Sequence, residues 1–119
     1  MSAIRLATWN VNSIKVRLPH LLQWLAAQDA MKAPIDALCL QELKLTEDKF
    51  PFAELEAAGY YSLVAGQKTY NGVAILLRKA SLAAITQDVN TAFLSPIKNN
   101  PKFADEQQRI LAATVCFKE

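Results

Sequence analysis

The chain has 119 residues, of which 52% are apolar and 20% are charged, and its formal net charge is +2. This length suits one small domain, and the composition excludes a disordered chain and a membrane-spanning one. The small excess of positive charge does not attract nucleic acid over long range, so DNA binding would require a local basic patch. The N-terminus lacks the basic and apolar regions of a secretion signal, which favours a cytoplasmic protein that does not contact the membrane.

Short apolar runs bounded by polar or turn residues predict β-strands along the chain. They cover residues 4–9, 36–41, 60–65, 73–78, 82–87 and 110–117. A turn that contains Tyr70 separates the third and fourth of these strands. Residues 90–108 carry prolines and asparagines, and we expect them to form a long loop.

Two segments predict helices. Leu18, Leu21, Leu22 and Leu25 repeat at helical spacing, and Pro19 is expected in the first turn, where its missing N–H costs little. Residues 51–58 predict a short helix that ends at Gly59. The fold class is therefore α/β, with one mixed sheet and flanking helices.

Several predicted strands are apolar on successive residues, which indicates that both faces of the sheet are covered. The predicted helices cover only one face, so the other face needs a partner layer. Either a second copy packs there, or the chain is half of a larger domain. Cys39 and Cys116 lie in apolar runs, and we expect both to be reduced residues of the core.

Polar residues gather where the strands end, which is where α/β folds usually keep their sites. Asn10 and Asn12 follow the first strand, Glu42 and Lys44 follow the second, and a Tyr70–Asn71 pair precedes the fourth. If the first two strands are parallel neighbours, as a strand–helix–strand unit implies, Asn10, Asn12 and Glu42 converge on one edge. A carboxylate flanked by amides suits a hard cation such as Mg²⁺.

Each cluster also has a purely structural interpretation. The asparagines could form a turn by bonding their own backbone, and Glu42 with Lys44 could be a solvated ion pair that contributes little. Arg109 could contact a phosphate or could be a surface charge. His20, the only histidine, lies among leucines away from every strand end, so the sequence offers no serine or cysteine triad.

Together the motifs resemble the exonuclease III family of abasic-site endonucleases, within the endonuclease/exonuclease/phosphatase superfamily. The resemblance is carried by four segments in family order: residues 7–13, 40–44, 66–74 and 108–110. It implies that residues 1–119 form the N-terminal half of a four-layer α/β–β/α sandwich. It also implies hydrolysis of the phosphodiester 5′ to abasic sites, and trimming of 3′ ends, in double-stranded DNA.

The resemblance assigns a role to each candidate residue. Glu42 would bind Mg²⁺, with Mn²⁺ as an alternative ion, and Asn10 would lie beside the metal. Tyr70 would act near the scissile phosphate, and Lys44 near the metal-binding carboxylate. The remaining positions, Asn12, Asn71 and Arg109, would contribute to substrate binding.

The family's C-terminal motifs, a Gly-Asp-x-Asn segment and a Ser-Asp-His segment, have no counterpart in the sequence. We therefore expect this chain to be inactive alone. Two other functions remain open: a catalytically dead module that binds DNA or self-associates through the uncovered sheet face, and a phosphatase acting on a small molecule. A large exposed apolar face favours such association.

Overall fold

The computed structural model describes residues 3–83, 93–98 and 109–118. The strands are β1 (Leu6–Asn10), β2 (Ala37–Gln41), β3 (Tyr60–Ala65), β4 (Val73–Arg78), β5 (Phe93–Lys98) and β6 (Leu111–Val115). The helices are α1 (Ile14–Ala30) and α2 (Phe52–Ala57), with 3₁₀ turns at Glu47–Lys49 and Lys79–Ser81.

The main sheet has four strands in the order β1-β2-β4-β3. β1 runs parallel to β2, whereas β4 runs antiparallel to both of its neighbours. The predicted mixed sheet and the predicted parallel pairing of the first two strands are therefore confirmed.

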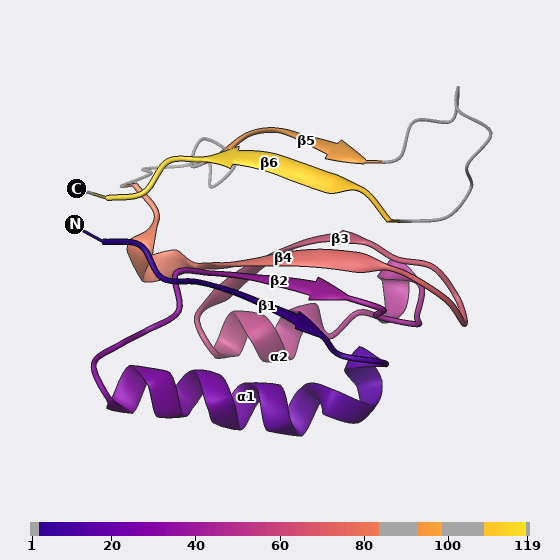
Figure 1. Cartoon of the computed structure of the whole chain (residues 1–119), viewed down its shortest axis with the longest axis horizontal. Coiled ribbons are helices and arrows are strands. Elements are labelled where there is room, and N and C mark those ends of the chain that lie inside the picture. Colours follow the sequence, from indigo (N-terminus) through magenta and orange to yellow (C-terminus); the bar gives the residue numbers. More distant parts are fainter. Residues whose placement is uncertain (1–2, 84–92, 99–108, 119) are drawn as a thin grey trace.

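Both helices pack on one face of this sheet, and the β5–β6 hairpin lies over the other (Figure 1). The core on the helix side contains leucines from every layer: Leu21 and Leu25 of α1, Leu55 of α2, Leu38 and Leu40 of β2, and Leu76 of β4. Alternate residues of a strand face opposite sides, so Ala37, Cys39 and Gln41 of β2 face away from the helices.

Helix α1 begins earlier than the leucine repeat alone predicts. Ser13 caps it, and its hydroxyl oxygen accepts a hydrogen bond from the Val16 N–H at 3.4 Å. Pro19 consequently lies inside the helix rather than in its first turn, which corrects the prediction. The earlier start places the helix N-terminus directly after the polar residues that follow β1.

A buried network at the opposite end of the sheet fixes where its strands begin. Asp36 is 5% exposed. One of its carboxylate oxygens accepts from the Arg5 backbone N–H at 2.7 Å, and the other accepts from the Ser81 hydroxyl. Arg78 also donates to the Ser81 hydroxyl oxygen, at 3.1 Å. This network joins the starts of β1 and β2, whose parallel register decides which residues meet where those strands end.

The β6 strand corrects the predicted cover of the sheet. Its residues alternate between half-buried and exposed, so this apolar run is not covered on both faces. Val115, which faces inward from β6, and Phe117, which follows the strand, both pack on the cluster that contains Ala37 and Leu77. Part of the partner layer that we expected outside the chain is thus supplied by the chain itself.

Two further predictions are wrong. Both cysteines are exposed, because Cys39 faces the part of the sheet that β6 does not reach and Cys116 points outward from the end of β6. The expected loop contains strand β5, and the rest of that stretch up to residue 108 lies outside the described residues. Of the strand expected at residues 82–87, residues 84–87 lie outside the described residues, and Leu82 forms a bridge with Phe117.

Candidate active site

The ends of β1 and β2 bring the first two polar clusters together. Asn10 and Gln41 are paired residues of the parallel ladder, so the residues that follow them leave the sheet side by side. The Asn10 side-chain amide donates to a carboxylate oxygen of Glu42. The Lys44 ammonium donates to the side-chain carbonyl of Asn12. The backbone N–H of Asn12 donates to the Asn10 side-chain oxygen at 3.2 Å.

Backbone hydrogen bonds hold these segments in register beyond the strands. The N–H groups of Val11, Ser13 and Ile14 donate to the carbonyls of Gln41, Glu42 and Leu43 at 3.0, 2.8 and 3.1 Å. This pairing continues up to the first residue of α1. The side chains of Asn10, Asn12 and Glu42 are therefore positioned by backbone as well as by their own contacts.

The third cluster reaches the same edge through the loop between β3 and β4. The N–H groups of Leu43 and Lys44 donate to the carbonyls of Gly72 and Asn71, at 3.1 and 3.0 Å. Asn71 thus lies beside the Glu42–Lys44 segment. Tyr70, which precedes Asn71 in this loop, is 68% exposed. Within the described residues its hydroxyl makes no hydrogen bond.

A pocket at this edge joins Arg109 to the site. It is lined by Gln41, Glu42, Asn71, Gly72, Val73 and Arg109. Arg109 is exposed and lies two residues before the start of β6. Arg109, Glu42 and Asn71, which are far apart in sequence, therefore line one cavity.

The backbone at this edge is held in an uncommon conformation. Seven non-glycine residues in the described part have positive φ, and only Lys32 lies elsewhere. The others are Asn12, Ser13, Glu42, Lys44, Thr69 and Asn71, with φ of 47, 87, 56, 60, 71 and 55°. Left-handed residues that carry side chains are strained and cluster at functional sites.

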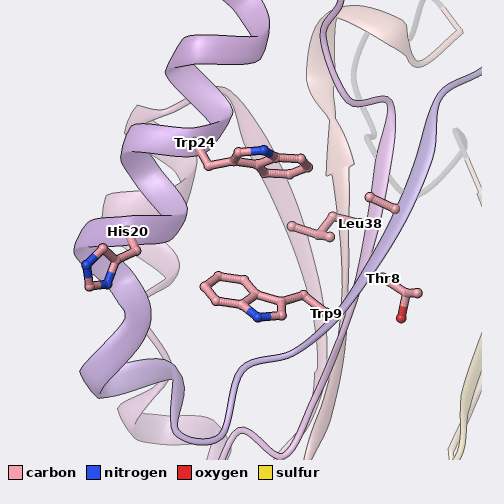
Figure 2. Close-up of a pocket in the computed structure, with 6 residues that line it drawn as sticks. Thr8, Trp9, His20, Trp24 and Leu38 are labelled. Carbon is pink, nitrogen blue, oxygen red and sulfur yellow. The ribbon is translucent and has the colours of Figure 1, made fainter.

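Sequence reasoning did not identify Gln41 as part of the site. Its side-chain amide donates to the Thr8 hydroxyl oxygen at 2.8 Å, and it lines the pocket with Glu42. Its position directly before Glu42, at the end of an otherwise apolar strand, could have indicated that it belongs to the site. His20 lies on α1 beside Trp9 and Trp24 (Figure 2), away from this edge, as the sequence predicts.

The donor set suits a metal held by one carboxylate. Glu42 offers carboxylate oxygens beside the Asn10 amide, and oxygen ligands are what Mg²⁺ prefers. Within the described residues, no three His, Cys, Asp or Glu side chains gather closely enough to hold a metal ion. A divalent ion here would therefore complete its coordination with water and phosphate oxygens.

Comparison with known proteins identifies the family. The Endonuclease/Exonuclease/phosphatase family profile matches residues 7–110, and the chain belongs to this family. It is 32% identical over 76 residues to exodeoxyribonuclease III of Haemophilus influenzae, covering 64% of this chain and 27% of that protein.

Solved structures show the same likeness. A 3′ phosphatase from Neisseria, bound to a product DNA hairpin, superposes with a TM-score of 0.72 at 45% identity, covering 95% of this chain and 38% of that chain. An abasic-site endonuclease from Archaeoglobus fulgidus has a TM-score of 0.57 at 40% identity, covering 63% of this chain and 27% of that chain. The chain thus spans well under half the length of these relatives, and its sheet and helices are part of their α/β sandwich fold.

Within the described residues, no helix is both long enough and apolar enough to span a membrane.

Proposed function

We propose that this chain is the N-terminal half of a magnesium-dependent DNA-repair nuclease, which hydrolyses the phosphodiester 5′ to abasic sites and removes nucleotides from 3′ ends. The carrying observation is the convergence of Asn10, Glu42, Asn71 and Arg109 at one edge of the sheet. Family membership supports nuclease chemistry. The DNA hairpin bound to the Neisseria protein supports DNA as the substrate.

The roles follow from the charges and contacts at this edge. Glu42, beside the Asn10 amide, would hold Mg²⁺ or Mn²⁺, which would stabilise the charge that develops on the phosphate. Lys44 and Arg109 would add positive charge around the same phosphate, and Arg109 already lines the pocket with Glu42. Asn12 holds the Lys44 ammonium in place.

Asn71 and Tyr70 would contact the DNA. Asn71 lines the pocket and its backbone is fixed against Lys44. Tyr70 is exposed at the tip of the same loop, where its hydroxyl is accessible to a DNA strand lying over the site. An abasic site has no base to read, so recognition would depend on the shape and backbone of the DNA.

We further propose that the chain alone does not turn over. Among the described residues, Glu42 is the one carboxylate that lines the pocket, and no second acid or histidine accompanies it there to activate water. General-base catalysis typically contributes about 100- to 10,000-fold to rate. The segment that would supply the base lies in the part of the relatives that this chain does not span.

Incision of a duplex with one abasic site, measured with and without Mg²⁺, tests the proposal. We would compare the 119-residue chain with a chimera in which it is followed by the remaining length of the Neisseria relative. The chimera should cleave and the short chain should not. In the chimera, Glu42→Gln should lower the rate by about 100-fold or more, as loss of a transition-state electrostatic contact does.

Glu54→Gln is the matched control, because Glu54 is an exposed glutamate on α2, outside the pocket. It should leave incision unchanged. Cleavage by the short chain that disappears in Glu42→Gln would show that the described residues suffice and would contradict the half-site proposal. A Glu42→Gln chimera as active as the unsubstituted chimera would contradict the metal-binding role.

A second substrate is favoured by one specific observation. The Neisseria relative at 45% identity is a 3′ phosphatase. A duplex with a 3′-phosphate at a nick, presented to the same chimera, separates the two activities. Release of phosphate without incision at the abasic site would favour the 3′ phosphatase.

A further inference from the structure

Gln41 is the last residue of β2, and the nitrogen of its side-chain amide already has two hydrogen-bond partners. It donates to the Thr8 hydroxyl oxygen at 2.8 Å and to the Cys39 carbonyl at 3.1 Å. A carbonyl only accepts hydrogen bonds, so the amide atom that faces Cys39 is the nitrogen and not the oxygen. These two partners therefore fix which way the amide is turned.

The same two partners direct the amide oxygen toward the candidate active site. The Thr8 side chain points away from α1 (Figure 2), and Thr8 is the ladder partner of Cys39. Cys39 lies two residues before Gln41, so their side chains share a face of the sheet. Gln41 lines the pocket that contains Arg109, whereas Thr8 and Cys39 do not. The polar atom that the Gln41 side chain has left to offer this pocket is its oxygen, Oε1.

A neutral oxygen beside Glu42 suits the Arg109 guanidinium. A guanidinium has five N–H donors and no acceptor, so each of its hydrogen bonds ends on an acceptor. An ion pair with Glu42 would compete with a metal for the carboxylate and would offset the positive charge. An amide oxygen holds the guanidinium and leaves both the carboxylate and the positive charge available.

We propose that Gln41 is a positioning residue for Arg109. Thr8 fixes the Gln41 amide, and the Gln41 Oε1 accepts a hydrogen bond from the Arg109 guanidinium, which holds the guanidinium at the pocket. Gln41 itself does not touch the phosphate. The effect on rate rests on the proposed phosphodiester hydrolysis, whereas the hydrogen bonds from Thr8 to Arg109 do not depend on it.

Positioning of this kind matters for an exposed arginine. Arg109 lies outside the strands, two residues before β6, and a long side chain loses rotamer freedom when it binds a phosphate. An acceptor that orients the guanidinium beforehand lowers this cost. Gln41 is suited to this task because it lies within the β1–β2 ladder, where Asn10 is its partner.

The hydrogen bonds are tested by NMR on the 119-residue chain, without DNA or metal. Gln41→Leu removes the acceptor and Thr8→Val releases the amide, so each should shift the guanidinium resonances of Arg109. Thr8→Ser keeps the hydroxyl and should leave these resonances as in the wild-type chain. Gln23→Leu is the matched control, because Gln23 is an exposed glutamine of α1, and it should leave them unchanged.

The effect on hydrolysis is tested by abasic-site incision with the chimera. Gln41→Leu should lower kcat/KM by about 10-fold, as loss of a hydrogen bond to a charged group does, and Thr8→Val should lower it by less. In an Arg109→Ala background, Gln41→Leu should cost less than about 2-fold, because the residue that it positions is gone. The Mg²⁺ concentration for half-maximal rate should stay the same, since the contact between Glu42 and Asn10 is kept.

Four results would overturn the proposal. They are Arg109 resonances that stay in place in both Gln41→Leu and Thr8→Val, a Thr8→Ser chain that behaves like Thr8→Val, an equal cost of Gln41→Leu with and without Arg109, and a raised Mg²⁺ requirement in Gln41→Leu. A chimera that does not incise, together with the expected NMR shifts, would contradict the proposed function and support the contact between Gln41 and Arg109.

Discussion

Tyr60 couples the buried side of the sheet to pH. It is 2% exposed, and its hydroxyl donates to the Ile35 carbonyl at 3.0 Å. Burial raises the pKa of Tyr60 to about 12; the charges of Asp29 and Asp36 also raise it, while that of Arg78 lowers it. An unfolded tyrosine has a pKa of about 10, so the unfolded chain loses this proton first as pH rises.

The free energy of unfolding should therefore contain a Tyr60 contribution that is complete below about pH 10 and is lost as pH rises to about 12. Between these values the expected slope is about 1.4 kcal/mol per pH unit. Tyr60→Phe should abolish this slope and lower stability at neutral pH by about 1 kcal/mol, through loss of the hydrogen bond. Urea unfolding at several pH values measures both effects.

Tyr61→Phe is the control, because Tyr61 is half-buried on the opposite face of the same strand. It should keep the alkaline slope of the wild-type chain. A Tyr60→Phe protein that keeps the full slope would show that another group titrates in this range.

Residue types and strand ends were enough to predict which polar side chains meet where β1 and β2 end. Asn10, Asn12, Glu42 and Lys44 meet as the parallel pairing of β1 and β2 requires. The direction of the Tyr70 side chain could not be predicted, because Thr69 and Asn71 on either side of it adopt positive φ. Spacing along a chain carries no information about such left-handed residues unless they are glycines.

At the scale of elements, the loop from Gly66 to Gly72 is held against the segment that carries Glu42. A Cβ added at Gly66 would lie 2.6 Å from the Glu47 nitrogen, and one added at Gly72 would lie 3.0 Å from the Leu43 Cβ. Gly72 also has φ of 88°. The loop that places Asn71 and Tyr70 therefore depends on the absence of side chains at both of its ends.

Gly72→Ala should destabilise the protein by more than Gly59→Ala does. Gly59 has φ of 94° but nothing within 4 Å of an added Cβ, so its substitution costs backbone strain alone, about 1–2 kcal/mol. At Gly72 the contact with Leu43 adds to a similar strain, and we expect a total of about 2–4 kcal/mol. Urea unfolding of the two variants measures the difference.

The Leu43 and Lys44 amides donate to this loop, so NMR shifts at these residues report its position. They should move in Gly72→Ala and stay in place in Gly59→Ala. Equal stability of the two variants would mean that the loop shifts without cost and does not position Asn71.

The predictions of helices and strands were wrong where a local sequence pattern is compatible with more than one structure. Strands β3 and β4 match their predicted bounds, because apolar residues and turns bracket them on both sides. Helix α1 starts before its leucines because Ser13 and the backbone pairing with Glu42 and Leu43 decide its first turn. Strand β5 contains Pro96. Proline near asparagines predicted a loop, but in the structure the segment pairs with β6 as a strand.

At the scale of the whole molecule, the sheet is unevenly covered. Two helices cover one face, whereas β6 and Phe117 cover the β4 side of the other face (Figure 1). Thr8, Leu6 and Cys39, on β1 and β2, remain exposed on that face. A sequence cannot show this unevenness, because an apolar strand reads alike whether its cover is complete or partial.

Cys39 reports on this uncovered region directly. Its thiol is exposed, but partial burial raises its pKa, and the thiolate is the reactive form. In a Cys116→Ser background the native protein should react with a thiol reagent without denaturant, at a rate below that of free cysteine near pH 8. A Cys39→Ser protein, with Cys116 exposed at the end of β6, provides the complementary measurement.

The concentration dependence of this reaction tests whether two copies pack through the exposed face of β2. If the β2 face stays open, the Cys39 rate should stay constant from dilute to concentrated protein. Packing of two copies through that face would bury Cys39 and slow its reaction as the dimer forms. A Cys39 thiol that is inert in the dilute native protein would contradict the open face itself, and would require cover over β2 that the β5–β6 hairpin does not provide.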